Sequence, residues 1–94
     1  MKTIRIKIYG HVQGVFYRMS TKEKAKELNV KGFILNDPDG SVFIEAQGDE
    51  KNLSKLIEWC KTGPKHAHID NVEYQVIPLK KKHRSFMIIH NYPK

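Results

Sequence analysis

The chain has 94 residues, of which 39% are hydrophobic and 29% are charged, so we expect one globular domain over residues 1–94 and exclude a disordered chain. Lys and Arg number 17 against 10 Asp and Glu, and the formal net charge of +7 indicates anionic partners. The single cysteine, Cys60, excludes an internal disulfide and any zinc site with two or more Cys ligands.

The N-terminal third predicts a strand, a turn and a helix. Residues 4–8 alternate between isoleucine and a basic residue, which is the period of a half-buried strand. This strand ends at Gly10, and Gly10 with Gly14 indicates a turn with unusual backbone angles. A helix follows from near Tyr17 or Ser20 to Asn29, because that stretch is rich in helix-forming residues.

A hairpin and a second helix come next. Residues 32–36 and 42–47 are predicted as antiparallel strands, because the Asp-Pro-Asp-Gly sequence between them is typical of a type I turn. From Leu53 to Cys60, apolar residues recur at i, i+3, i+4 and i+7, which predicts an amphipathic helix. Asp49 is its expected N-cap, and Gly63-Pro64 ends it.

The C-terminal third predicts two more strands. Residues 72–76 alternate as a fourth strand, which could begin at His68, and residues 86–89 form the last one. The basic run at 80–84 lies between them as a loop. The resulting order, βαββαβ plus a terminal strand, predicts an α+β, ferredoxin-like split βαβ fold with two helices on one face of an antiparallel sheet.

The segment from Gly10 to Arg18 is the candidate site, because it joins a strand to a helix. A glycine-containing loop lets backbone N–H groups converge, the helix N-terminus adds partial positive charge, and Arg18 adds a full one. These features suit a phosphate or carboxylate. The alternative is an ordinary turn with Arg18 as a surface charge, and the residues alone leave both interpretations open. The segment matches neither a Walker loop nor Gly-x-Gly-x-x-Gly.

No nucleophile or metal ligand set accompanies this segment. Cys60 lies on the apolar stripe of the second helix, where we expect core packing. Asp37, Asp39, Asp49 and Asp70 lie in turns and caps, where acidic residues are common. A phosphate held here would therefore be attacked by water, with catalysis by positioning and charge stabilisation. The suitable leaving group is one that departs unaided, such as the carboxylate of an acyl phosphate.

Two segments resemble the signatures of a known family. The run from Gly10 to Arg18 resembles the first signature of the acylphosphatases, and residues 32–48 resemble the second. The resemblance continues through residues 59–64 and covers essentially the whole chain. It implies hydrolysis of the carboxyl-phosphate bond of acyl phosphates to carboxylate and phosphate, with water as nucleophile and without metal or cofactor.

The resemblance also implies the roles of single residues. Arg18 would bind the substrate phosphate, Asn36 would orient the attacking water, and the substrate's own phosphate would accept a proton. Asn36 by itself would indicate a structural turn residue after a strand, and only its place in the second signature favours the catalytic role. Backbone N–H groups of the loop would share the phosphate, which makes the expected phosphate-binding residues Gln13, Gly14, Val15, Phe16, Tyr17 and Arg18.

The sequence departs from the family pattern at several positions. Tyr17 stands where Phe or Met is usual, and its hydroxyl needs a partner if it is buried. Strand alternation directs Leu35 to the face opposite Asn36, so we expect Leu35 to affect packing or surface. His68 stands at a position that is commonly basic.

The alternative function is a basic ferredoxin-like module, either binding nucleic acid or acting as an accessory domain without catalytic activity. Two features argue against nucleic-acid binding. Arginine, which is the preferred residue for contacting guanine, supplies only three of the 17 cations. Phe33 and Phe43, which could stack on bases if they were exposed, are expected to pack in the core or at an edge. The run at 80–84 is either a solvated loop or a charge that steers anions.

The remaining expectations concern partners and location. A chain of family length argues against an accessory domain. We expect a monomer, and we expect its partner to be a small-molecule acyl phosphate. No apolar run approaches the ~18 residues of a membrane-spanning helix, and the N-terminus does not resemble a signal peptide. We therefore expect a cytoplasmic protein without a membrane segment.

Overall fold

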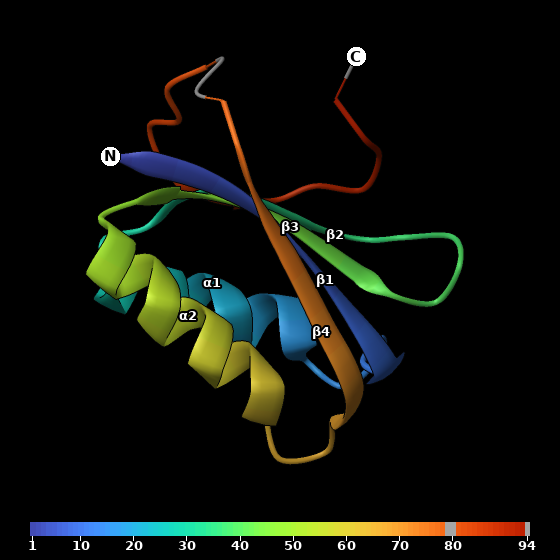
Figure 1. Ribbon diagram of the computed structural model, residues 1–94. Coiled ribbons are helices and arrows are strands. Elements are labelled where there is room, and N and C mark those ends of the chain that lie inside the picture. The colour runs from blue at the N-terminus through green and yellow to red at the C-terminus, as the bar shows by residue number, and fades with distance from the viewer. Residues whose placement is uncertain (79–80, 94) are drawn as a thin grey trace.

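A computed structural model describes residues 1–78 and 81–93, so Lys80, at the start of the basic run, lies outside the described residues. The elements follow one another in the predicted order (Figure 1). They are β1 (Lys2–His11), α1 (Tyr17–Glu27), β2 (Lys31–Asn36), β3 (Val42–Gly48), α2 (Glu50–Thr62), β4 (His68–Ile77) and β5 (Phe86–Ile88).

The five strands form one sheet in the order β4-β1-β3-β2-β5. All neighbours are antiparallel except β5, which pairs parallel to β2. Both helices cover one face of this sheet (Figure 1). The predicted ferredoxin-like α+β fold is therefore confirmed, and the terminal strand makes the sheet mixed. Since β4 and β5 lie at opposite edges, the chain between them has to cross the sheet.

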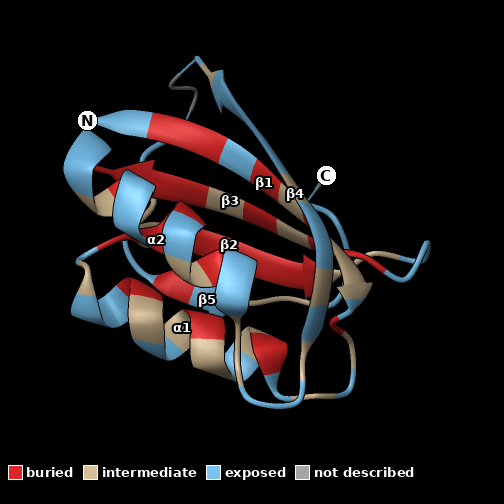
Figure 2. Ribbon diagram, turned by 60° about the horizontal axis from the view of Figure 1, so that its bottom comes forward, coloured by how far each residue is buried: buried red, intermediate tan, exposed pale blue. Residues whose placement is uncertain are grey.

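The core lies between the sheet and the helices (Figure 2). The alternation in β1 buries Ile4, Ile6 and Ile8 on the helix face, and each is at most 3% exposed. The apolar stripe of α2, from Leu53 to Cys60, packs against them. Burying one such aliphatic side chain contributes about 1.5–3 kcal/mol, so the core pattern is sufficient to orient each element.

The helix ends agree with the predicted boundaries. Asp49 occupies the N-cap position of α2, although its side chain makes no capping hydrogen bond, and Gly63 is the C-cap. The helix α1 begins at Tyr17 and presents a narrow buried stripe of Tyr17, Thr21 and Ala25. Within the described ranges, no helix is long and apolar enough to cross a membrane.

The other face of the sheet carries a second group of packed side chains. Phe33 is 9% exposed, Leu35 is 1% exposed, and Phe43 is half-buried. The expectation that Phe33 and Phe43 pack instead of standing exposed is confirmed. Leu35 contributes to packing on this face, as its alternation with Asn36 predicts.

Candidate active site

The loop after β1 contains the predicted turn with unusual backbone angles. Gly10 has φ 133°, and a Cβ atom there would lie 2.1 Å from the carbonyl oxygen of His68 on the neighbouring strand. The pairing of β1 with β4 shifts its register between Tyr9 and Gly10. Gly14 has φ 74°, in the left-handed region that favours glycine. Both glycines therefore allow the chain to leave the sheet and turn into α1.

The N-terminus of α1 is open to an anion. Phe16 is its N-cap residue, has a left-handed backbone with φ 61°, and is 80% exposed. No side chain caps this end, and the first turn contains no acidic residue. The first N–H groups of a helix lack intrahelical partners and carry partial positive charge. Arg18, the second residue of α1, adds its guanidinium at the same place.

One pocket of about 350 Å³ brings the loop and the end of β2 together. Arg18 and Asn36, the two predicted catalytic residues, both line it. Three of the other predicted residues, Gly14, Phe16 and Tyr17, line it as well. The remaining lining residues are Val12, Met19, Ile88 and His90.

The side chain of Asn36 has an unusual environment. Its Oδ1 atom is buried and accepts no hydrogen bond from any described residue. Leaving a buried amide oxygen without a partner costs about 1–3 kcal/mol, so such groups in folded proteins are normally satisfied by protein, water or ligand. Asn36 itself lines the pocket, where its side-chain amide can donate a hydrogen bond to a water and leave a lone pair of that water free to attack.

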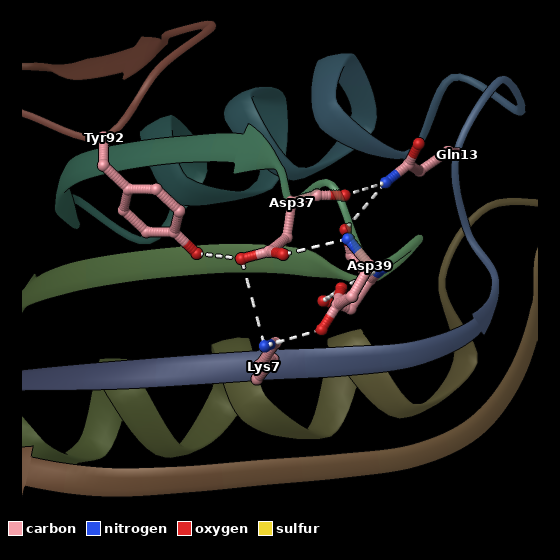
Figure 3. A network of polar contacts seen from close by, with 6 residues as sticks. Lys7, Gln13, Asp37, Asp39 and Tyr92 are labelled. Atoms are coloured by element: carbon pink, nitrogen blue, oxygen red, sulfur yellow. Dashed lines mark hydrogen bonds and ion pairs between the residues drawn. The ribbon is translucent and has the colours of Figure 1, made fainter.

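Gln13 and Val15 are not among the residues that line the pocket. The Gln13 side chain instead reaches the turn between β2 and β3, where its Nε2 donates to the carbonyl oxygens of Asp37 at 2.8 Å and Ser41 at 2.9 Å (Figure 3). Val15 packs against the hydrophobic core. Both side chains thus hold the loop in place next to Asn36.

A polar network continues from this turn (Figure 3). The Lys7 Nζ atom lies 2.9 Å from Asp39 and 3.9 Å from Asp37, and the Tyr92 hydroxyl donates to the Asp37 carboxylate. Ser41 donates to Asp39 from its backbone N–H and from its hydroxyl. The hydrogen bonds from Ser41, followed by that from Lys7, hold the pKa of Asp39 well below its usual range.

Tyr17 and Cys60 meet beneath the pocket. The Tyr17 ring is 1% exposed, and its hydroxyl donates to the Cys60 carbonyl oxygen at 2.9 Å. This is the partner that a buried hydroxyl needs at this departure from the family pattern. Burial raises the pKa of Tyr17 far above its usual range and that of the Cys60 thiol to about 12. Cys60 is a protonated core residue, as the stripe of α2 predicts.

Sequence reasoning missed Ile88 and His90 as pocket residues. The parallel register pairs Gly32 with Phe86 and Ile34 with Ile88, so the chain after β5 runs level with the end of β2. Parallel strands present the same ends at the same edge of a sheet, which places His90 beside Asn36. The strand itself is visible in the sequence, but its neighbour and direction are not.

Fold and pocket together define a class: a small ferredoxin-like protein in which a glycine loop, an uncapped helix N-terminus, an arginine and a strand-end asparagine surround one candidate anion site. A family model described as Acylphosphatase matches residues 4–88. The chain belongs to the acylphosphatase family.

Individual relatives agree with this assignment. An acylphosphatase of Marinobacter nauticus is 43% identical over 83 residues, which are 88% of this chain and 90% of the relative. The crystal structure of acylphosphatase from Bacillus subtilis superposes with a TM-score of 0.92 at 29% identity, covering 95% of this chain and 99% of that one. Full-length HypF contains a similar unit, with a TM-score of 0.86 and 29% identity over 94% of this chain and 12% of that chain.

Proposed function

We propose that the protein hydrolyses the carboxyl-phosphate bond of small acyl phosphates in the pocket between the loop and the end of β2. The observation that carries this proposal is the convergence of Arg18, an uncapped helix N-terminus and Asn36 in one pocket. The first two suit a phosphate, and the third suits a water. Membership of the acylphosphatase family supports the same reaction.

The phosphate is bound by the guanidinium of Arg18 and by backbone N–H groups of the loop from Gln13 to Arg18. The guanidinium and the helix N-terminus both stabilise the negative charge on the phosphoryl oxygens. Because the donors are held by the fold before substrate arrives, they need little reorganisation in the transition state. Gln13 and Val15 contribute through the shape of the loop.

The attacking water is oriented by Asn36. The water oxygen forms a bond to phosphorus while the bond between phosphorus and the acyl oxygen breaks, and the electron pair of that bond leaves with the carboxylate. The proton of the water passes to a phosphate oxygen of the substrate. A carboxylate is a stable leaving group, so the reaction needs neither a general acid nor a protein nucleophile, in keeping with the buried and protonated Cys60.

Hydrolysis of benzoyl phosphate, followed with a chelator present, tests this proposal. We expect Arg18→Ala and Asn36→Ala each to lower the rate by about two orders of magnitude or more, the loss typical of an electrostatic stabiliser. Lys26→Ala removes a charge from an exposed position of α1, and Asn71→Ala removes an amide from β4; both should keep the native rate. Full activity of the Asn36 variant would refute its role with water, and loss of activity with chelator would refute the metal-free reaction.

The alternative is a nucleic-acid-binding or accessory module without catalytic activity. The similarity to a segment of full-length HypF shows that this unit occurs inside a longer chain. The match of the acylphosphatase family model to residues 4–88 argues against the nucleic-acid alternative. An inactive native protein with tight, salt-sensitive RNA binding would favour this alternative.

We further propose that the protein acts as a cytoplasmic monomer. The buried, free Cys60 supports a reducing compartment. Sedimentation velocity at micromolar concentration should give a single species of monomer mass. A dimer with full activity would contradict the monomer, and recovery of the native protein from a secreted fraction would contradict the location.

A further inference from the structure

A second and larger cavity lies on the face of the sheet opposite the helices. It is a groove of about 670 Å³ between the open face and the chain that precedes and follows β5. None of its lining residues belongs to the pocket of Arg18 and Asn36. The proposed hydrolysis therefore gives this groove no role.

Four rings form the apolar part of the groove. Phe33 and Phe43 lie side by side on neighbouring strands with their ring centroids 6.1 Å apart. His83 approaches Phe33 edge-on at 5.8 Å, and Tyr92 packs against Phe43 at 5.2 Å. These separations are typical of aromatic pairs, and a further planar ring can stack on or beside such a group.

The rim of the groove is strongly basic. Arg5, Lys81, Lys82 and Arg84 all line it. Among the lining residues, Glu45 carries a carboxylate. This carboxylate is already paired with Arg5 Nε at 3.3 Å and with His83 Nε2 at 2.7 Å. The rim therefore carries an excess of positive charge around the four aromatic rings. A surface of this charge favours an anionic ligand.

The basic segment, residues 81–84, is held against the sheet and forms one wall of the groove. Gln47, which is 1% exposed, donates from Nε2 to the Lys81 carbonyl oxygen at 2.7 Å and accepts from the His83 backbone N–H at 2.8 Å. The same Nε2 donates to the Thr3 hydroxyl at 3.0 Å. The single buried side chain of Gln47 therefore fixes the backbone on both sides of Lys82, in contrast to a loop that is only solvated. The backbone that carries the cations is thus positioned in advance.

From these contacts we propose that the groove binds a small planar aromatic anion. Its ring lies against Phe33 and Phe43, and its anionic group faces Arg5, Lys82 and Arg84. A volume of about 670 Å³ lies within the ~300–1,000 Å³ of small-molecule sites, which suits one ring system with one anionic group. The proposal gives a common role to the Phe33–Phe43 pair and to the described part of the basic run, neither of which takes part in hydrolysis.

An NMR titration of the full ¹⁵N-labelled chain with 1-naphthoate tests this site, with inorganic phosphate present at saturation to occupy the catalytic pocket. We expect shift changes centred on the amides of Phe33, Phe43 and residues 81–84. Two ligands separate the contributions: cyclohexanecarboxylate has the charge without a planar ring, and 1-naphthalenemethanol has the ring without the charge. Each should bind about fivefold more weakly or worse than 1-naphthoate.

Matched variants locate the contributions in the groove. Arg84→Ala should weaken 1-naphthoate about two- to fivefold, as expected for one exposed ionic contact, and the loss should shrink as salt rises. Phe43→Leu should weaken it about two- to tenfold through loss of ring contact. Lys65→Ala also removes an exposed charge, but one outside the groove, and it should leave binding unchanged.

Three results would overturn the proposal. Equal binding of 1-naphthoate and its uncharged analogue would reduce the groove to a hydrophobic patch. Shifts confined to residues 13–18 would place the ligand in the catalytic pocket instead. Binding of an oligothymidylate through the groove without binding of 1-naphthoate would replace the small ligand by single-stranded nucleic acid. Because the readout is binding and not hydrolysis, its outcome is independent of whether the Arg18 pocket is catalytic.

Discussion

The side-chain amide of Gln13 lies 2.8 Å from the carbonyl oxygen of Asp37, which directly follows Asn36 in the chain. This contact joins the loop before α1 to the end of β2, across 24 residues of sequence. Since Oδ1 of Asn36 accepts no hydrogen bond from a described residue, its position relative to Arg18 depends on how the surrounding backbone is held. Gln13 is therefore the link between the two halves of the pocket.

Replacement of Gln13 by alanine should reduce both stability and catalysis. The variant removes the Gln13 hydrogen bonds to the carbonyl oxygens of Asp37 and Ser41, which keep the backbone N–H donors of Gly40 and Asp37. At about 1 kcal/mol for each lost hydrogen bond, the free energy of unfolding should fall by about 2 kcal/mol. A small displacement of positioned groups can cost up to ~100-fold in rate, so we expect kcat for benzoyl phosphate to fall about tenfold or more. Urea denaturation and steady-state kinetics measure the two effects. Gln75→Ala, on the exposed strand β4, is the control, and an unchanged kcat in Gln13→Ala would show that the link does not position the site.

Replacement of Tyr17 by phenylalanine should destabilise the protein. The Cys60 carbonyl lies in the last turn of α2, where carbonyl groups lack intrahelical partners, and the Tyr17 hydroxyl satisfies it in a buried place. Loss of that donor should lower the free energy of unfolding by about 1–2 kcal/mol. The same change at Tyr74, which is 59% exposed on β4, should have little effect. Equal urea midpoints for native protein and Tyr17→Phe would contradict the structural role of the hydroxyl.

Alkaline pH should weaken the fold through Cys60 and Tyr17. Burial raises the pKa of the Cys60 thiol from 9.0 to about 12, and it raises the pKa of Tyr17 as well. The folded state therefore keeps protons that the unfolded chain releases, and the stabilisation is complete below about pH 9 and declines as pH rises above it. Between pH 8 and 10.5, Cys60 alone should lower the free energy of unfolding by about 2 kcal/mol, since one pKa unit corresponds to about 1.4 kcal/mol. Urea titrations at both pH values measure this loss, and an equally large loss in Cys60→Ala would rule out the thiol as its source.

Acidic pH should loosen the turn that follows Asn36. The hydrogen bonds from Ser41 and Lys7 lower the pKa of Asp39 from its ordinary value of 3.8 in the folded state. The carboxylate therefore stabilises the turn above about pH 4, and this contribution is lost as pH falls below that value. We expect the urea midpoint of Asp39→Asn to change less between pH 5 and pH 3 than that of the native protein. Asp49→Asn changes an exposed carboxylate that makes no capping hydrogen bond, and it should retain the native dependence.

The elements of the fold could be predicted because their patterns are local. The alternation at residues 4–8 and the i, i+3, i+4, i+7 stripe from Leu53 to Cys60 each repeat with the period of their own element. The observed ends differ by only a few residues: the strand expected over 4–10 spans Lys2–His11, and the last strand ends at Ile88. Helix α1, with its narrow apolar stripe, begins at Tyr17, the earlier of the two expected starts.

What the sequence alone determined is the set of elements, their order and the two segments that carry the family signatures. Tertiary structure decided which side chains meet: Gln13 with Asp37, Tyr17 with Cys60, and Gln47 with the basic segment. It also paired β5 parallel to β2, which brought Ile88 and His90 to the pocket and carried the basic segment across the open face. The physical reason is distance along the chain. A helix or strand repeats within a few residues and leaves a period in the sequence, whereas the partners in these contacts are separated by 24 to 43 residues and meet only when the sheet has assembled.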